Sequence, residues 1–106
     1  MEYKQLETIL LVEDNEDHIE HTRDALREGG LVNRINVVKD GEAALDYLFR
    51  RKEYTDPAAA PRPCLVLLDV KLPKVGGFEV LEKIKTDSDL KCIPVILLTT
   101  TGNRED

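Results

Sequence analysis

A chain of 106 residues, of which 42% are hydrophobic and 34% charged, has the length and composition of one ordinary globular domain. Its net charge of −6 argues against a general nucleic-acid-binding surface, because a phosphate backbone requires a basic footprint. The sequence has no apolar run near the ~20 residues of a membrane span and no basic-then-apolar leader. We therefore expect no membrane association and a cytoplasmic protein.

The first apolar run predicts a strand that is followed by a helix. Residues 8–12 are typical of a buried strand and end at two acids, Glu13 and Asp14. Asn15 is suited to cap a helix over residues 16–28, whose first turn is acidic as helix N-termini prefer. The residues expected on its apolar side recur at helical spacing: Ile19, Thr22, Ala25 and Leu26.

A second strand and helix are expected next. Residues 35–38 read as a short strand, and Asp40-Gly41 turns into a helix. The residues expected on one face of that helix are Ala44, Leu45, Leu48 and Phe49. Over residues 52–63 three prolines forbid a regular helix, so we expect an exposed loop.

The central stretch of the chain is the apolar run 65–68, which ends abruptly at Asp69. A short continuous apolar run is typical of a strand that is buried on both faces of a parallel sheet. A third helix is then marked by Phe78, Leu81 and Ile84. A fourth strand is expected over residues 95–98, leading into Thr99.

This alternation of strands and helices predicts an α/β fold with a parallel sheet and helices on both faces. The periodicity does not say which strands are neighbours. If the order is 2-1-3-4, the first and third strands meet where the winding reverses, at the edge where such folds bind ligands. Four side chains would gather in that crevice: Glu13, Asp14, Asp69 and Thr99.

Three carboxylates in one cleft repel one another unless a cation is present. Hard oxygen ligands select Mg²⁺ or Mn²⁺, and such a site suits phosphate chemistry in which one carboxylate is the nucleophile. A simpler interpretation is that Asp14 caps a helix and Asp69 only ends a strand. His18 and His21 are expected to be exposed helix residues with no part in a site.

Three motifs in this order resemble the receiver domain of two-component response regulators. They are Leu-Val-Glu-Asp-Asn (11–15), Leu-Leu-Asp-Val-Lys-Leu-Pro-Lys-Val-Gly-Gly (67–77) and Pro-Val-Ile-Leu-Leu-Thr (94–99). The resemblance runs from about residue 8 to residue 102. The long loop before the third strand and residues 40–48 are similar to single-domain receivers that partner phytochrome-type histidine kinases.

The resemblance implies a flavodoxin-like, doubly wound parallel sheet and a role for each site residue. Asp69 would be the phosphoacceptor for a kinase phosphohistidine, and Thr99 the switch hydroxyl. Asp14 would ligate Mg²⁺ or Mn²⁺ directly, Glu13 would assist through water, and Lys71 would contribute its backbone carbonyl. Chemistry would be limited to this transfer onto the protein's own aspartate, so the chain would not be an enzyme in the usual sense.

The family's fourth helix, its lysine-bearing fifth strand and its last helix have no counterpart before Asp106. We therefore expect residues 1–106 to be a receiver domain that is incomplete at its C-terminus because of truncation. The fourth strand would then be an apolar edge, through which two copies associate or swap segments.

Two alternatives follow from the same residues. One is a phosphorylation-incompetent fragment that acts only by dimerisation or docking. The other, a metal-dependent phosphatase with an aspartyl nucleophile, ranks lower because Lys71 stands where the second acid of its Asp-x-Asp motif would be.

Overall fold

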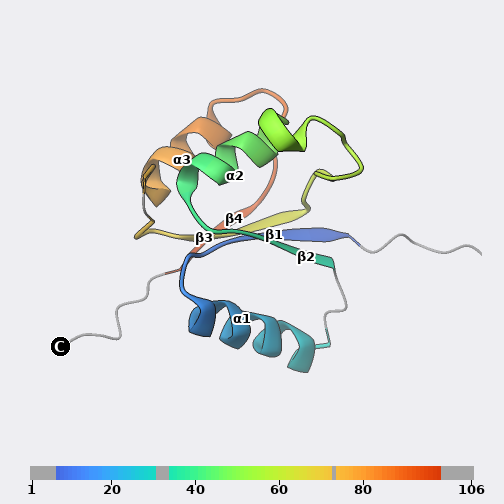
Figure 1. The fold of residues 1–106 in the computed structure, drawn as a ribbon, viewed down its shortest axis with the longest axis vertical. Helices are drawn as coiled ribbons and strands as arrows, with labels where there is room; N and C mark the ends of the chain where they lie inside the picture. The colour runs from blue at the N-terminus through green and yellow to red at the C-terminus, as the bar shows by residue number, and fades with distance from the viewer. Residues whose placement is uncertain (1–6, 31–33, 73, 99–106) are drawn as a thin grey trace, which may run out of the picture.

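The computed structural model describes residues 7–30, 34–72 and 74–98. Strands and helices alternate in it as the sequence predicts (Figure 1). In chain order the elements are β1 (Thr8–Val12), α1 (Glu16–Glu28), β2 (Arg34–Val38), α2 (Gly41–Leu48), a 3₁₀ turn η1 (Lys52–Tyr54), β3 (Leu65–Asp69), α3 (Gly77–Lys85) and β4 (Val95–Leu98).

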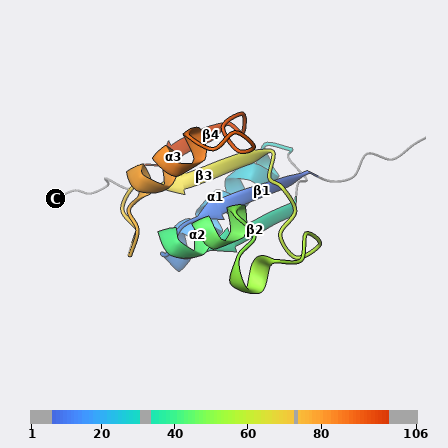
Figure 2. The same ribbon diagram turned by 90° about the horizontal axis from the view of Figure 1, so that it is seen from above.

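The described strands form one parallel sheet in the order β2-β1-β3-β4. Helix α1 covers one face of this sheet, and α2 and α3 cover the other (Figures 1 and 2). The predicted α/β class and the 2-1-3-4 order are confirmed. The winding reverses between β1 and β3, so the carboxyl ends of these two strands are neighbours.

Side chains alternate between the two faces along each strand, which divides the core into two parts. The part under α2 and α3 includes Leu10, Val12, Val66, Leu68, Val80 and Ile84. The part under α1 is smaller and comprises Ile9, Leu11, Ile19 and Leu67. Burial on both faces explains why the central strands read as continuous apolar runs.

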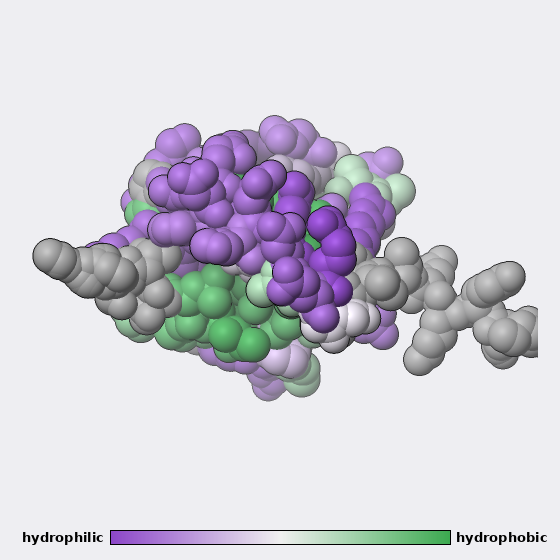
Figure 3. Space-filling model, turned by 90° about the horizontal axis from the view of Figure 1, so that it is seen from below, coloured by the Kyte–Doolittle hydropathy of each residue, from purple (hydrophilic) through white to green (hydrophobic). Residues whose placement is uncertain are grey.

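Among the residues that the structure describes, the α1 side of the sheet is incompletely covered. Ile96 in β4 is 49% exposed, and Leu65 and Leu98, which pack against the α1-side core, are only half-buried. Figure 3 shows an apolar patch beside the polar surface of α1, over the end of the sheet formed by β3 and β4. We call Leu65, Ile96 and Leu98 the β4 patch.

Three predictions about helix faces are wrong, although the helix bounds agree closely. Ala25 of α1 is exposed, and Ile19 is the residue of that helix that is fully buried. Phe49 lies at the C-cap of α2 and is 36% exposed. Phe78 is 66% exposed, because α3 begins with Gly77 against the backbone of Asp69, where a Cβ atom would lie 2.5 Å from the Asp69 carbonyl oxygen. Val80 and Ile84 of α3 are buried, so the expectation holds for Ile84 and missed Val80.

The stretch predicted to be an exposed loop, residues 52–63, is partly packed against α2. Tyr47 of α2 donates a hydrogen bond from its hydroxyl to the Pro61 carbonyl at 2.9 Å. The ring centroids of Tyr54 and Tyr47 lie 5.3 Å apart, and Ala60 is 1% exposed. The prolines exclude a regular helix, but they leave an irregular segment that can bury its apolar side chains.

The start of α2 is joined to the loop that follows β3. Asp40 caps α2 by accepting from the Ala43 N–H at 2.7 Å, and its other oxygen lies 3.7 Å from the Lys74 ammonium. Gly41 lies against this loop so closely that a Cβ atom would be 2.0 Å from the Val75 carbonyl oxygen. Only glycine fits this approach without a shift of one backbone.

Gly41→Ala is therefore expected to lower the free energy of unfolding by about 1–3 kcal/mol, the usual penalty for overpacking. Gly76→Ala is the matched control, because a methyl group there would have no heavy atom within 4 Å and the φ of −70° suits alanine. It is expected to change stability by less than ~1 kcal/mol. Urea unfolding measures both, and equal stabilities of the two variants would contradict the close approach at Gly41.

Candidate metal centre

Strand pairing brings two acids to the same level at the carboxyl edge of the sheet. Val12 of β1 pairs with Leu68 of β3, so the next residues along each strand, Glu13 and Asp69, lie side by side. Side-chain alternation directs both toward the face that α1 covers. The Glu13 N–H donates to the Val38 carbonyl at 3.0 Å, which holds this residue against β2 as well.

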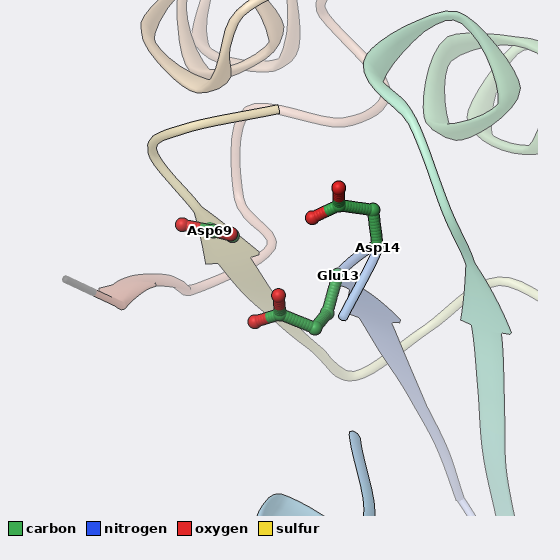
Figure 4. Close-up of side chains that lie close together, drawn as sticks. All are labelled: Glu13, Asp14 and Asp69. Atoms are coloured by element: carbon green, nitrogen blue, oxygen red, sulfur yellow. The ribbon is translucent and has the colours of Figure 1, made fainter. Parts of the chain in front are cut away.

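Asp14 completes a group of three carboxylates. Oxygens of Glu13, Asp14 and Asp69 all lie within 4.8 Å of one another, and Figure 4 shows the three side chains converging from the ends of β1 and β3. Glu13 is 1% and Asp69 2% exposed, whereas Asp14 is open to solvent. The structure thus brings together the three acids expected to share this crevice.

The electrostatics of this group are unfavourable without a cation. Burial raises the pKa of Glu13 above its ordinary value, and the neighbouring Asp69 carboxylate raises it further. The Asn15 N–H, which donates to Glu13 at 3.2 Å, opposes this rise. Within the described part of the chain, none of the three acids forms an ion pair with a lysine or an arginine.

The donor set fits a hard divalent cation. Mg²⁺ and Mn²⁺ bind carboxylate and carbonyl oxygens together with water, and one solvent-exposed acid beside two buried ones leaves room for water ligands. A divalent charge would also offset the burial and the repulsion that together raise the pKa of Glu13.

The remaining predicted site residues lie partly outside this group. The Lys71 N–H donates to Asp69 Oδ1 at 3.0 Å, which places the Lys71 backbone next to the acid, while its side chain is exposed. The use of its carbonyl as a metal ligand stays a prediction. Thr99 lies outside the described residues.

One residue that lies beside the three acids, His18, was not expected there from the sequence. Its Nδ1 lies 3.4 Å from Glu13 Oε2, and the residue is half-buried, so the expected exposure is wrong for His18. His21, one turn further on, is exposed as expected. The available signal was the position of His18 as third residue after the Asn15 cap, since side chains there reach back toward the residues that precede the helix.

Comparison with known families identifies the class of protein. Residues 9–106 match the response regulator receiver domain, and the chain belongs to this family. It is 42% identical over 98 residues to the response regulator Rcp1 of Synechocystis sp., an alignment that covers 92% of this chain and 65% of Rcp1. The chain therefore spans about two thirds of the length of this relative.

Solved structures of related proteins have the same fold. The bacteriophytochrome response regulator AtBRR is 45% identical and superposes with a TM-score of 0.84, over 92% of this chain and 69% of AtBRR. The phosphorylated cyanobacterial phytochrome response regulator RcpA is 43% identical with a TM-score of 0.81, over 93% of this chain and 69% of RcpA. The Mn²⁺-bound form of Rcp1 is 41% identical with a TM-score of 0.81, over 92% and 68% of the two chains.

Glu13→Gln is expected to stabilise the metal-free protein at neutral pH. Because the pKa of Glu13 is raised in the folded state above 4.5, the folded chain binds more protons than the unfolded chain as this acid titrates. Stability therefore falls as the pH rises through this range, and the full penalty is present once Glu13 is ionised. The glutamine variant lacks this penalty.

Thermal unfolding in EDTA, measured between about pH 4 and pH 7, follows this loss of stability as Glu13 ionises. Glu20→Gln, an exposed acid of α1, is the control and should leave the pH dependence unchanged. A Glu13→Gln variant that is less stable than the unsubstituted chain at neutral pH would contradict the assignment.

Proposed function

We propose that this chain is a phosphoacceptor receiver of a two-component pathway, in which Asp69 takes a phosphoryl group from a histidine kinase. The observation that carries the proposal is the convergence of Glu13, Asp14 and Asp69 within 4.8 Å at the carboxyl edge of a receiver fold. Related structures that were solved with Mn²⁺ and in a phosphorylated form support it.

In the proposed reaction, an oxygen of the Asp69 carboxylate attacks the phosphorus of a phosphohistidine. An O–P bond forms to Asp69, the N–P bond breaks, and the imidazole nitrogen leaves with the electron pair. The hydrogen bond from the Lys71 N–H to Asp69 Oδ1 fixes the carboxylate in one orientation for this attack.

A bound Mg²⁺ or Mn²⁺ would neutralise negative charge on the transferring group. Asp14 and Asp69 would hold it directly, with Glu13 assisting through water and the Lys71 carbonyl as a further ligand. Thr99 would hydrogen-bond a phosphoryl oxygen as the switch hydroxyl. These roles follow from the family resemblance and from the chemistry of the donor set.

The proposed donor is a phytochrome-type histidine kinase, because AtBRR and RcpA are named as phytochrome response regulators. Such a kinase uses ATP, so the proposed location is the cytoplasm. Among the residues that the structure describes, no helix has the length and apolar character needed to cross a membrane.

Asp69→Asn is expected to abolish phosphorylation, because the amide is not a nucleophile toward phosphorus. The measurement is acyl-phosphate formation from acetyl phosphate or from a phosphorylated kinase in the presence of Mg²⁺, followed by intact mass. Asp17→Asn, an exposed acid in the first turn of α1, is the matched control and should be phosphorylated normally. Labelling that survives in Asp69→Asn would refute the assignment of the phosphoacceptor.

A second candidate function is self-association that does not depend on phosphate, and the β4 patch favours it. β4 is the last strand on its side of the described sheet, and Ile96 is 49% exposed there. An apolar edge strand is a surface that natural proteins normally cover or charge. Two copies that meet through this strand would cover the patch of each.

Ile96→Lys is expected to weaken such association at least ~10-fold, because the interface would have to bury an unpaired ammonium group. Phe78→Lys serves as control, since Phe78 is exposed on α3, on the opposite side of the sheet. Sedimentation equilibrium measures the dissociation constants. An unsubstituted chain that stays monomeric at high concentration would refute this candidate.

A further inference from the structure

The position of His18 is fixed by the cap of α1. Asn15 Oδ1 accepts a hydrogen bond from the His18 N–H at 3.1 Å, which anchors the backbone of the first turn. A side chain at this third helical position points back toward the N-terminus of the helix. In this chain the residues that precede the helix are the metal-site acids Glu13 and Asp14.

The imidazole of His18 faces Glu13 with one buried nitrogen. Nδ1 lies 3.4 Å from Glu13 Oε2, is shielded from solvent, and has no hydrogen-bond partner among the described residues, although 44% of the side chain is exposed. The distance is slightly longer than the roughly 2.7–3.2 Å of an ordinary N–H···O bond. A buried nitrogen without a partner is unfavourable, so a small movement of the imidazole that forms a hydrogen bond from His18 Nδ1–H to the Glu13 carboxylate is favoured.

Glu13 Oε2 is thus approached from two sides. It accepts from the Asn15 N–H at 3.2 Å and lies opposite His18 Nδ1. The Asn15 N–H holds this oxygen, and a hydrogen bond from His18 would hold it from a second side, which would leave the other oxygen of Glu13 for the ion shared with Asp14 and Asp69. Carboxylates that ligate metals are commonly oriented in this way by hydrogen bonds from outside the metal's own ligands.

We propose that His18 is a positioning residue of the metal centre, whose Nδ1–H donates to Glu13 Oε2 and so orients this carboxylate toward the cation. The inference rests on the proposed function, since it requires that the three acids bind a divalent cation. It assigns His18 no direct bond to the metal.

The test is the affinity of the chain for Mn²⁺ at one fixed pH, measured from the electron paramagnetic resonance signal of free Mn²⁺. His18→Ala is expected to weaken binding ~10-fold or more, the usual effect of removing such a hydrogen bond. His18→Asn should recover most of the affinity, because its side-chain N–H₂ replaces the Nδ1 donor. His21→Ala, an exposed histidine of the same helix, should bind as the unsubstituted chain does.

Urea unfolding of each variant in EDTA separates a loss of fold from a loss of metal binding. If His18→Ala does not fold, the Mn²⁺ affinities of His18→Asn and His18→Gln are compared instead. The asparagine variant should bind more tightly, because glutamine carries its N–H₂ one carbon further out. Equal Mn²⁺ affinity of His18→Ala and His21→Ala, or equal losses in the alanine and asparagine variants, would overturn the positioning role alone. An unsubstituted chain that binds no Mn²⁺ would overturn the metal centre and, with it, this inference.

Discussion

The burial of two neighbouring carboxylates is the constraint on which the site depends. Glu13 and Asp69 are exposed by only 1% and 2%, and the pairing of β1 with β3 forces them side by side. Removing an ionised group from water costs several kcal/mol even after the protein relaxes, and a second charge of the same sign adds to that penalty. The pairing that causes the repulsion is fixed by the apolar residues of both strands, so the strands cannot separate to relieve it. A protein keeps such an arrangement where a cation or a transferred group offsets it, which is why we propose this strand edge as the functional site.

The loops that follow β1 and β3 offset part of the cost of burying Glu13 and Asp69. The Asn15 N–H donates to Glu13, and the Lys71 N–H donates to Asp69, so each buried acid accepts one main-chain hydrogen bond from the loop directly after it. The loop after β3 is also tied to α2 through the approach of Gly41 to Val75. A change in charge at Asp69 would therefore act first on a loop that contacts two helices, α2 and α3.

Much of the fold could be predicted from the sequence, because apolar runs that end in acids mark strand ends and Asn15 marks a helix start. The order of the strands could not be read from periodicity, and it was the order that brought Asp69 to Glu13. On α3, Ile84 is buried as expected but Phe78 is exposed. Gly77 packs against the Asp69 backbone at the start of this helix, and no spacing of apolar residues encodes that contact. His18 was missed for a related reason. Its proposed role depends on a side chain that turns back toward the residues before the helix, whereas helical spacing describes only contacts along the helix.

The two candidate functions are physically connected rather than exclusive. Asp69 is paired across the sheet with Leu98, and the Val70 N–H donates to the Leu98 carbonyl at 3.3 Å, so the acid and the β4 patch belong to one pair of strands. Leu98 packs against the α1-side core, on the same face of the sheet as Ile96. If two copies associate through this face, any change at Asp69 that moves the end of β4 alters their affinity. By thermodynamic linkage, association must then alter the equilibrium at Asp69 by the same factor. The strength of that coupling depends on how rigidly the backbone bonds between β3 and β4 transmit the change, since these bonds lie directly between the acid and the patch.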